Sequence, residues 1–105
     1  MELYRGMSTV EWKEWLAASA IPTPKNFTSD AAEALAFGRK YLLEGRLFVL
    51  AVAYDDLLFQ QTVPVKESDL GGAWFENTCQ IGLGEILYSC LTPHKLKQRK
   101  QSLVP

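Results

Sequence analysis

The longest apolar run in the sequence, residues 47–54, constrains the fold more than any other feature. Its eight residues are apolar at both odd and even positions, so neither face of a strand there would suit contact with water. Such a run is typical of a strand that lies inside a sheet and is covered on both faces. A transmembrane helix needs about 20 apolar residues, so the run is too short to cross a membrane. We therefore predict a central strand over residues 47–54 and no membrane partner.

A capping signature predicts the first helix. Ser8 is followed three residues later by Glu11, which is the spacing of a capping box. In that motif the serine oxygen accepts from the backbone N–H of the glutamate, whose carboxylate accepts from the backbone N–H of the serine. The helix should run over about residues 9–19, because prolines 22 and 24 forbid its continuation. Its expected buried face is formed by Trp12, Trp15 and Leu16.

A second capping signature, Asp30 with Glu33 three residues later, predicts a second helix that ends near residue 44. Gly45 follows, and glycine is the residue that enters the left-handed region after a helix without steric penalty. Both predicted helices therefore lie in the N-terminal half of the chain.

Beyond the apolar run, the sequence predicts strands separated by a loop. The expected elements are strands over 57–65, 74–81 and 85–90, with a polar loop over 66–72. Pro64 has no backbone N–H, which places its strand at a sheet edge or in a bulge. A short first strand over 2–6 precedes the helices. This order predicts an α+β fold with two N-terminal helices packed on a mostly antiparallel sheet.

Charge is distributed unevenly along the 105 residues, although the formal net charge is only −1. Four basic residues lie in the last eleven positions: Lys95, Lys97, Arg99 and Lys100. Residues 1–94 hold the other seven basic and all twelve acidic residues, a net of −5. We predict one domain over 1–94 and a basic tail over 95–105. The tail is either a solvated end or a contact for nucleic-acid phosphates.

Targeting and redox signals are weak. The first residues contain no apolar segment of the signal-peptide type, so a cytoplasmic location is expected. Cys79 and Cys90 are then expected to be reduced thiols. One histidine and two distant cysteines do not make a zinc site, and no metal is predicted.

Three short segments occur in an informative order. Residues 3–6, Leu-Tyr-Arg-Gly, end the predicted first strand, and residues 27–30, Phe-Thr-Ser-Asp, precede the second helix. Residues 84–87, Gly-Glu-Ile-Leu, open a late strand. In this order the segments resemble the ADP-ribosyltransferase-like fold, in its arginine–serine–glutamate branch, whose members bind NAD.

The resemblance implies a role for each matched residue. Arg5 would hold the nucleotide, Thr28 and Ser29 would shape the nicotinamide pocket, and Glu85 would be the catalytic carboxylate. The implied function is transfer of ADP-ribose from NAD, with a protein as one acceptor, or cleavage of the nicotinamide–ribose bond. Leu83 stands where arginine-modifying members carry a glutamate or glutamine, so the resemblance does not extend to arginine as acceptor.

The residue types suit this chemistry on physical grounds. Breaking the nicotinamide–ribose bond develops positive charge on the ribose, which a carboxylate such as Glu85 would stabilise. A guanidinium such as Arg5 matches a diphosphate bidentately. If one dinucleotide uses all three positions, then Arg5, Ser29 and Glu85 should converge on one cleft, within about 12 Å of one another.

A second interpretation remains open. Arg5 would then pair with a surface carboxylate, and Glu85 would be an exposed charge at the end of a strand. Ser29 or Asp30 would only cap the second helix. The chain would be a non-enzymatic α+β module that binds another protein. A degenerate member of the ADP-ribosyltransferase-like fold also belongs to this class. Leu83 and the short chain favour this alternative.

Overall fold

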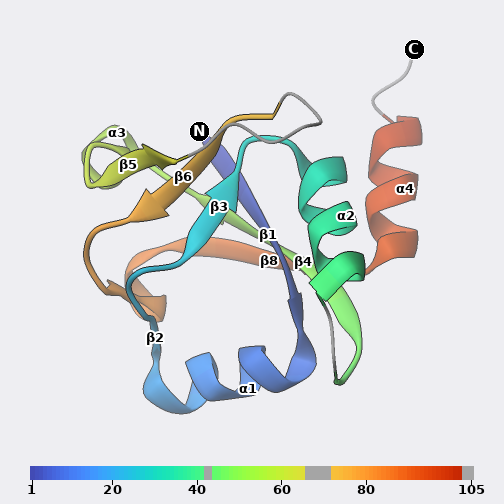
Figure 1. The fold of residues 1–105 in the computed structure, drawn as a ribbon, viewed down its shortest axis with the longest axis horizontal. Helices are drawn as coiled ribbons and strands as arrows, with labels where there is room; N and C mark the ends of the chain where they lie inside the picture. The colour runs from blue at the N-terminus through green and yellow to red at the C-terminus, as the bar shows by residue number, and fades with distance from the viewer. Residues whose placement is uncertain (42–43, 66–71, 103–105) are drawn as a thin grey trace.

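The structure is a computed structural model that describes residues 1–41, 44–65 and 72–102. Its strands are β1 (Glu2–Ser8), β2 (Ala20–Ile21), β3 (Asn26–Thr28), β4 (Leu47–Ala53), β5 (Thr62–Val65), β6 (Trp74–Asn77), β7 (Ile81–Gly82) and β8 (Leu87–Leu91). Its helices are α1 (Thr9–Ala18), α2 (Ala31–Tyr41), α3 (Asp56–Phe59) and α4 (Pro93–Ser102), with a 3₁₀ helix, η1, over Leu83–Glu85. The chain is thus an α+β domain (Figure 1).

Six strands form one sheet in the order β5-β6-β3-β1-β4-β8, and β2 pairs with β7 in a separate two-stranded sheet. Every strand pairing in the described residues is antiparallel. The longest pairing joins β1 to β4 over seven residues, from Glu2 opposite Ala53 to Ser8 opposite Leu47. This confirms the expected class of fold.

The apolar run forms β4, as predicted. Five consecutive residues of this strand, 48–52, are buried, and β4 lies inside the sheet between β1 and β8. Its alternate side chains enter two separate hydrophobic clusters. Leu50 and Val52 pack with Trp15 of α1, whereas Val49 packs with Ala34 of α2. The side chains of β4 are apolar on both faces of the strand because helices cover both faces.

Helix α2 lies very close to β1. An added Cβ on Gly6 would fall 2.0 Å from the carbonyl oxygen of Ala34, and Gly38 of the helix faces Gly6 in turn. Two glycines that face each other allow this close contact of backbones. The packing fixes α2 against the strand that carries Arg5, and so it positions the first candidate site residue.

Local signals explain the helix starts. Ser8 Oγ accepts from the backbone N–H of Glu11 at 3.1 Å, and Asp30 Oδ1 accepts from the N–H of Ala32 at 2.9 Å. Gly45 has a φ of +82°, the left-handed conformation predicted for it.

The buried face of α1 differs in part from the prediction. Trp15 is buried and Trp12 packs against the same core, but Leu16 is 46% exposed, so its predicted burial is wrong.

Several predictions about the C-terminal half need correction. The strand expected over 57–65 begins only at Thr62, because Asp55 caps the short helix α3 through the N–H of Leu58 at 2.8 Å. The strand expected over 74–81 is two short strands, β6 and β7. Pro64 does lie on an edge strand. The loop predicted over 66–72 falls outside the described residues except for Gly72.

Residues 95–102 of the expected basic tail belong instead to the helix α4, so the described chain contains four α-helices rather than two. Thr92 Oγ1 accepts from the backbone N–H of Lys95 at 3.1 Å, and Pro93 is the first helical residue. Proline is favoured at that position because its missing N–H would have no helical partner. Leu96 then anchors the helix beside Val49, with 4% of its surface exposed.

Candidate functional site

Arg5 lies on β1 and forms an ion pair with Glu11, which agrees with the alternative interpretation that Arg5 pairs with a carboxylate. Its Nε donates to Glu11 Oε1 at 2.9 Å, and its Nη2 donates to Oε2 at 3.3 Å. Its Nη1 donates to the backbone oxygen of Asn26 at 3.1 Å, and the guanidinium lies 5.7 Å from the centre of the Trp15 ring. Only 13% of the Arg5 side chain is exposed. The predicted capping box is therefore half formed, because the Glu11 carboxylate turns to Arg5 instead of Ser8.

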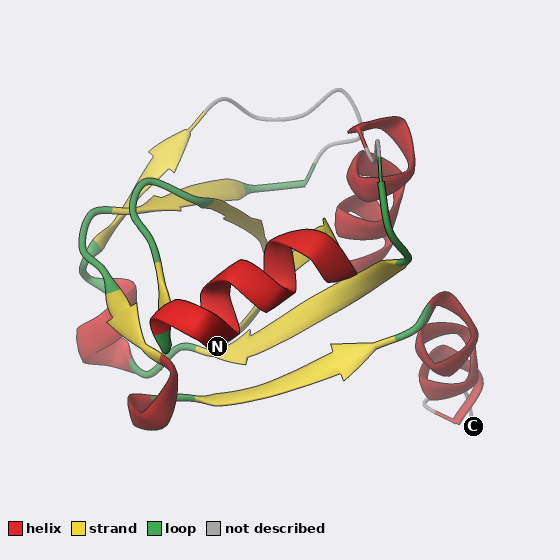
Figure 2. Cartoon of the chain, turned by 90° about the horizontal axis from the view of Figure 1, so that it is seen from below, coloured by secondary structure: helices red, strands yellow, loops and turns green. Residues whose placement is uncertain are grey.

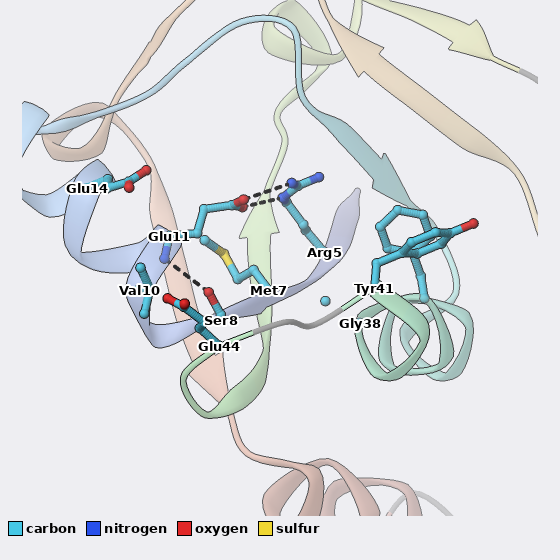
Figure 3. Close-up of a pocket in the computed structure, with 11 residues that line it drawn as sticks. Arg5, Met7, Ser8, Val10, Glu11, Glu14, Gly38, Tyr41 and Glu44 are labelled. Carbon is cyan, nitrogen blue, oxygen red and sulfur yellow. Dashed lines mark hydrogen bonds and ion pairs between the residues drawn. The ribbon is translucent and has the colours of Figure 1, made fainter.

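A cavity of about 410 Å³ opens beside Arg5 (Figure 3). It lies between the β1–α1 junction and α2, and its charged lining residues are Arg5 with three carboxylates, those of Glu11, Glu14 and Glu44. Phe37 and Tyr41 of α2 contribute aromatic rings. Because Glu11 already neutralises Arg5, the cavity is acidic overall. A diphosphate would meet repulsion there unless the ion pair opened.

Thr28 is the last residue of β3, the strand next to β1, and Ser29 follows it. Tyr4 is the register partner of Thr28. Thr28 is fully buried. Its hydroxyl donates to the backbone oxygen of Ala73 at 2.9 Å and accepts from the N–H of Asp30 at 3.2 Å. This hydroxyl ties β3 to the segment before β6 and to the start of α2. Ser29 is exposed, and its backbone N–H also donates to Ala73 at 3.3 Å.

Glu85 lies elsewhere. It belongs to η1 and not to the start of a strand, and it lines a second cavity of about 480 Å³ at the end of β4. The two cavities have no lining residue in common. The structure thus places Arg5 and Thr28 on neighbouring strands, and it places Arg5 and Glu85 at two different cavities. The family resemblance alone had linked these residues, and their sequence positions did not define a shared cleft.

The second cavity is lined by apolar side chains together with two exposed acidic residues. Leu57 of α3 and Leu87 of β8 line it, with 73% and 79% of their surfaces exposed. Asp55 and Glu85 supply carboxylates, and no basic residue of the described chain lines the cavity. Asp55 is occupied as the cap of α3, whereas the Glu85 side chain makes no hydrogen bond or ion pair within the described residues.

Tyr54, another lining residue of the second cavity, is buried to 1% exposure. Its hydroxyl has no hydrogen-bond partner in the part of the chain that the structure describes. Burial, and secondarily the nearby Cys79 thiol, raise the pKa of this phenol well above its ordinary value. The Tyr54 hydroxyl therefore keeps its proton to a higher pH than an exposed tyrosine does.

Glu33 is a buried group that sequence reasoning assigned only to helix capping. Its side chain is 4% exposed, and Oε1 accepts from Trp74 Nε1 at 2.7 Å. Oε2 has no partner among the described residues, and an added Cβ on Gly72 would fall 1.7 Å from it. Glu33 therefore ties α2 to β6. No local sequence signal identified this pairing, since 41 positions separate the two residues.

The described residues contain no group of three histidine, cysteine or acidic side chains placed to hold a metal ion. Cys79 and Cys90 are free thiols, as predicted. No helix in the described ranges has the length and apolar content that a bilayer crossing requires.

Comparisons with known proteins add no assignment: no protein family, no curated protein and no solved structure matches the chain. The site must therefore be interpreted from its own geometry.

Proposed function

We propose that this domain is a protein-interaction module, and that the cavity at the end of β4 holds an apolar side chain of a partner polypeptide. One observation carries the proposal: two leucines, Leu57 and Leu87, stand 73% and 79% exposed on the rim of a cavity of about 480 Å³. Exposed apolar groups beside a concave surface are typical of contact sites, whereas isolated exposed leucines need no explanation.

The charge of the cavity narrows the chemistry of the partner. Glu85 is exposed and without a described partner, and no described basic residue lines the cavity. A lysine or arginine next to the bound apolar side chain would therefore meet a favourable charge, and an acidic neighbour would be repelled. The proposed partner is thus a peptide segment with an apolar residue beside a basic one.

Two short probes test this proposal. N-acetyl-Leu-Lys-amide and N-acetyl-Leu-Glu-amide are titrated to millimolar concentration into ¹⁵N-labelled protein, and amide shifts are recorded. The lysine probe should move resonances around the cavity and bind about two- to fivefold more tightly than the glutamate probe, the range for one exposed ion pair. Glu85→Gln should remove that preference, and Leu57→Ser should weaken both probes.

Leu16→Ser is the matched control, because Leu16 is also exposed but lies on α1, outside the cavity. Its titration should equal that of the parent protein. Shifts scattered over the whole surface, or no shifts with either probe, would remove the proposal.

A second candidate function keeps the resemblance to ADP-ribosyltransferases. It is favoured by the pairing of β1 with β3, which places Arg5 on the strand next to Thr28. We propose for this candidate that NAD binds in the cavity beside Arg5, with its diphosphate replacing the Glu11 carboxylate. Glu85 would take part in catalysis only if its segment and the bound nicotinamide came together.

Calorimetric titration with NAD separates the two candidates. If NAD binds, Glu11→Gln should tighten it by removing the competing carboxylate, and Arg5→Ala should weaken it about tenfold or more through loss of a charge-assisted contact. A catalytic Glu85 would further require that Glu85→Gln lower nicotinamide release about 100-fold with little change in affinity. Absence of NAD binding at millimolar concentration would defeat this candidate and leave the interaction module standing.

A further inference from the structure

The two edges of the six-stranded sheet differ in how they are protected. One edge is β5, which has only four residues and contains Pro64. The other edge is β8, five residues long, Leu-Tyr-Ser-Cys-Leu, with neither proline nor charge. Natural sheets usually blunt an exposed edge with proline, charge or a very short strand, because free backbone groups there pair with other strands. Only the β5 edge has such protection.

The outer side of β8 is open in the described part of the chain. Its strand pairings are all with β4, and none of its backbone groups bonds to another described element. In Figure 2 it is the outermost strand of the sheet and leads into the C-terminal helix, which packs against β4 and Leu91 instead of lying along the edge. Four of its residues, 87–90, are exposed.

The side chains of β8 are apolar on both faces of the sheet. Tyr88 stands opposite Val52 in the register and contacts the Trp12 ring on the α1 face, with 5.3 Å between ring centres. Leu87 and Leu91 point to the other face, where Leu91 packs with the cluster around Val49. A strand added outside β8 would thus find apolar neighbours above and below the sheet.

We infer that two copies of this chain associate through antiparallel pairing of their β8 strands, with Ser89 on the two-fold axis. This register uses all five residues: Leu87 of one copy faces Leu91 of the other, Tyr88 faces Cys90, and Ser89 faces Ser89. An antiparallel edge pairs with itself by two-fold symmetry, so one surface serves both copies.

Charge favours a second copy as the occupant of this edge. The strand is uncharged, so two identical strands do not repel each other. Glu85 lies just before β8, whereas Lys95 and Lys97 lie exposed just after it on α4. Antiparallel pairing brings the acidic flank of each copy toward the basic flank of the other. A five-residue edge buries a modest area, so the dimer should be reversible and depend on concentration.

Sedimentation velocity over about 5 to 500 μM tests the association. The mass should rise from 11.8 kDa toward twice that value as concentration increases. Ser89→Glu places two like charges directly opposite each other and should weaken the dimer about two- to fivefold. Val63→Glu is the matched control, because Val63 is an exposed residue on the other sheet edge, β5. Circular dichroism checks that both variants fold.

A cross-link tests the register. In a background with Cys79→Ser and Cys90→Ser, the variant Ser89→Cys should form an intermolecular disulfide on mild oxidation. Residues directly opposite in an antiparallel pair have Cα atoms about 4.5–5.5 Å apart, within the span of a disulfide. Val63→Cys in the same background should cross-link far more slowly.

Two results would overturn the inference. One is a mass that stays at 11.8 kDa over the whole concentration range, and the other is a dimer that Ser89→Glu leaves as tight as before. Leu57→Ser, which alters the cavity at the end of β4, should leave the dimer unchanged, so this inference and the proposed binding function fail independently.

Discussion

Arg5 and Glu11 form a two-pronged ion pair, 2.9 Å from Nε to Oε1 and 3.3 Å from Nη2 to Oε2, between a central strand and the first turn of α1. The pair orients the helix on the sheet, and it also occupies the guanidinium that a nucleotide would need. The strength of this ion pair therefore affects both the stability of the fold and the ability of Arg5 to bind a nucleotide.

Arg5→Ala should lower the free energy of unfolding by about 1.5–3 kcal/mol, because the Asn26 carbonyl loses its Arg5 donor and the Glu11 carboxylate keeps only Lys25 Nζ, at 4.0 Å. Urea denaturation of Arg5→Ala, Glu11→Ala and the double variant measures the pairwise term. The double variant should lose less than the sum of the single losses. Arg39→Ala is the control, since Arg39 is exposed and has no described partner. Additive losses would show that the two residues stabilise the fold separately.

Glu33→Ala should destabilise the protein by about 1–3 kcal/mol, because the Trp74 N–H remains buried with no acceptor. Trp74→Phe removes the donor instead, and combining it with Glu33→Ala should add little to the loss from Glu33→Ala. Thermal or urea unfolding reports both values. Glu14→Ala, at an exposed glutamate of α1, should change stability by less than about 0.5 kcal/mol. An equally small effect of Glu33→Ala would mean that the buried contact contributes no net stability.

Gly6→Ala should be among the most damaging single substitutions in the chain. The new Cβ would lie 2.0 Å from the carbonyl oxygen of Ala34, so α2 would have to move away from β1. We expect a loss of about 3 kcal/mol or more, measured by urea denaturation or as a failure to fold. Gly84→Ala offers a matched control, because no atom lies within 4 Å of its added Cβ and its φ is not positive. Similar losses in both variants would contradict the close contact.

Tyr54 should make the protein lose stability at alkaline pH. Its pKa is raised in the folded state, so near and above pH 10 the unfolded chain ionises this phenol while the folded chain keeps the proton. The unfolded state then binds fewer protons, and the free energy of unfolding falls as pH rises, by up to about 1.4 kcal/mol per pH unit. Tyr54→Phe should flatten this loss, as measured by urea denaturation between pH 9 and 11. The exposed Tyr41, changed to phenylalanine, should leave the loss as it is.

The sequence by itself determined the features whose causes lie within a few residues. Ser8 and Asp30 start their helices because each accepts from an N–H two or three residues ahead. The apolar run became β4, because a strand that is apolar on both faces can be buried on both. Pro64 lies in an edge strand, because proline has no backbone N–H to donate to a second neighbouring strand. Pro93 follows β8 and is the first residue of α4, a helix that the sequence analysis did not predict.

Tertiary structure decided the partners of the charged residues. Glu11 had two available donors, the Ser8 N–H and the Arg5 guanidinium, and the packing of α1 on β1 selected Arg5. The pairing of Glu33 with Trp74 and the placement of Glu85 at a cavity separate from Arg5 likewise depend on strand order. Side-chain partners across a sheet follow from register, which is set by the burial of whole strands and not by any short motif. For this reason the order of Arg5, Ser29 and Glu85 along the sequence was enough to suggest a hypothesis, but it was not enough to define one common site.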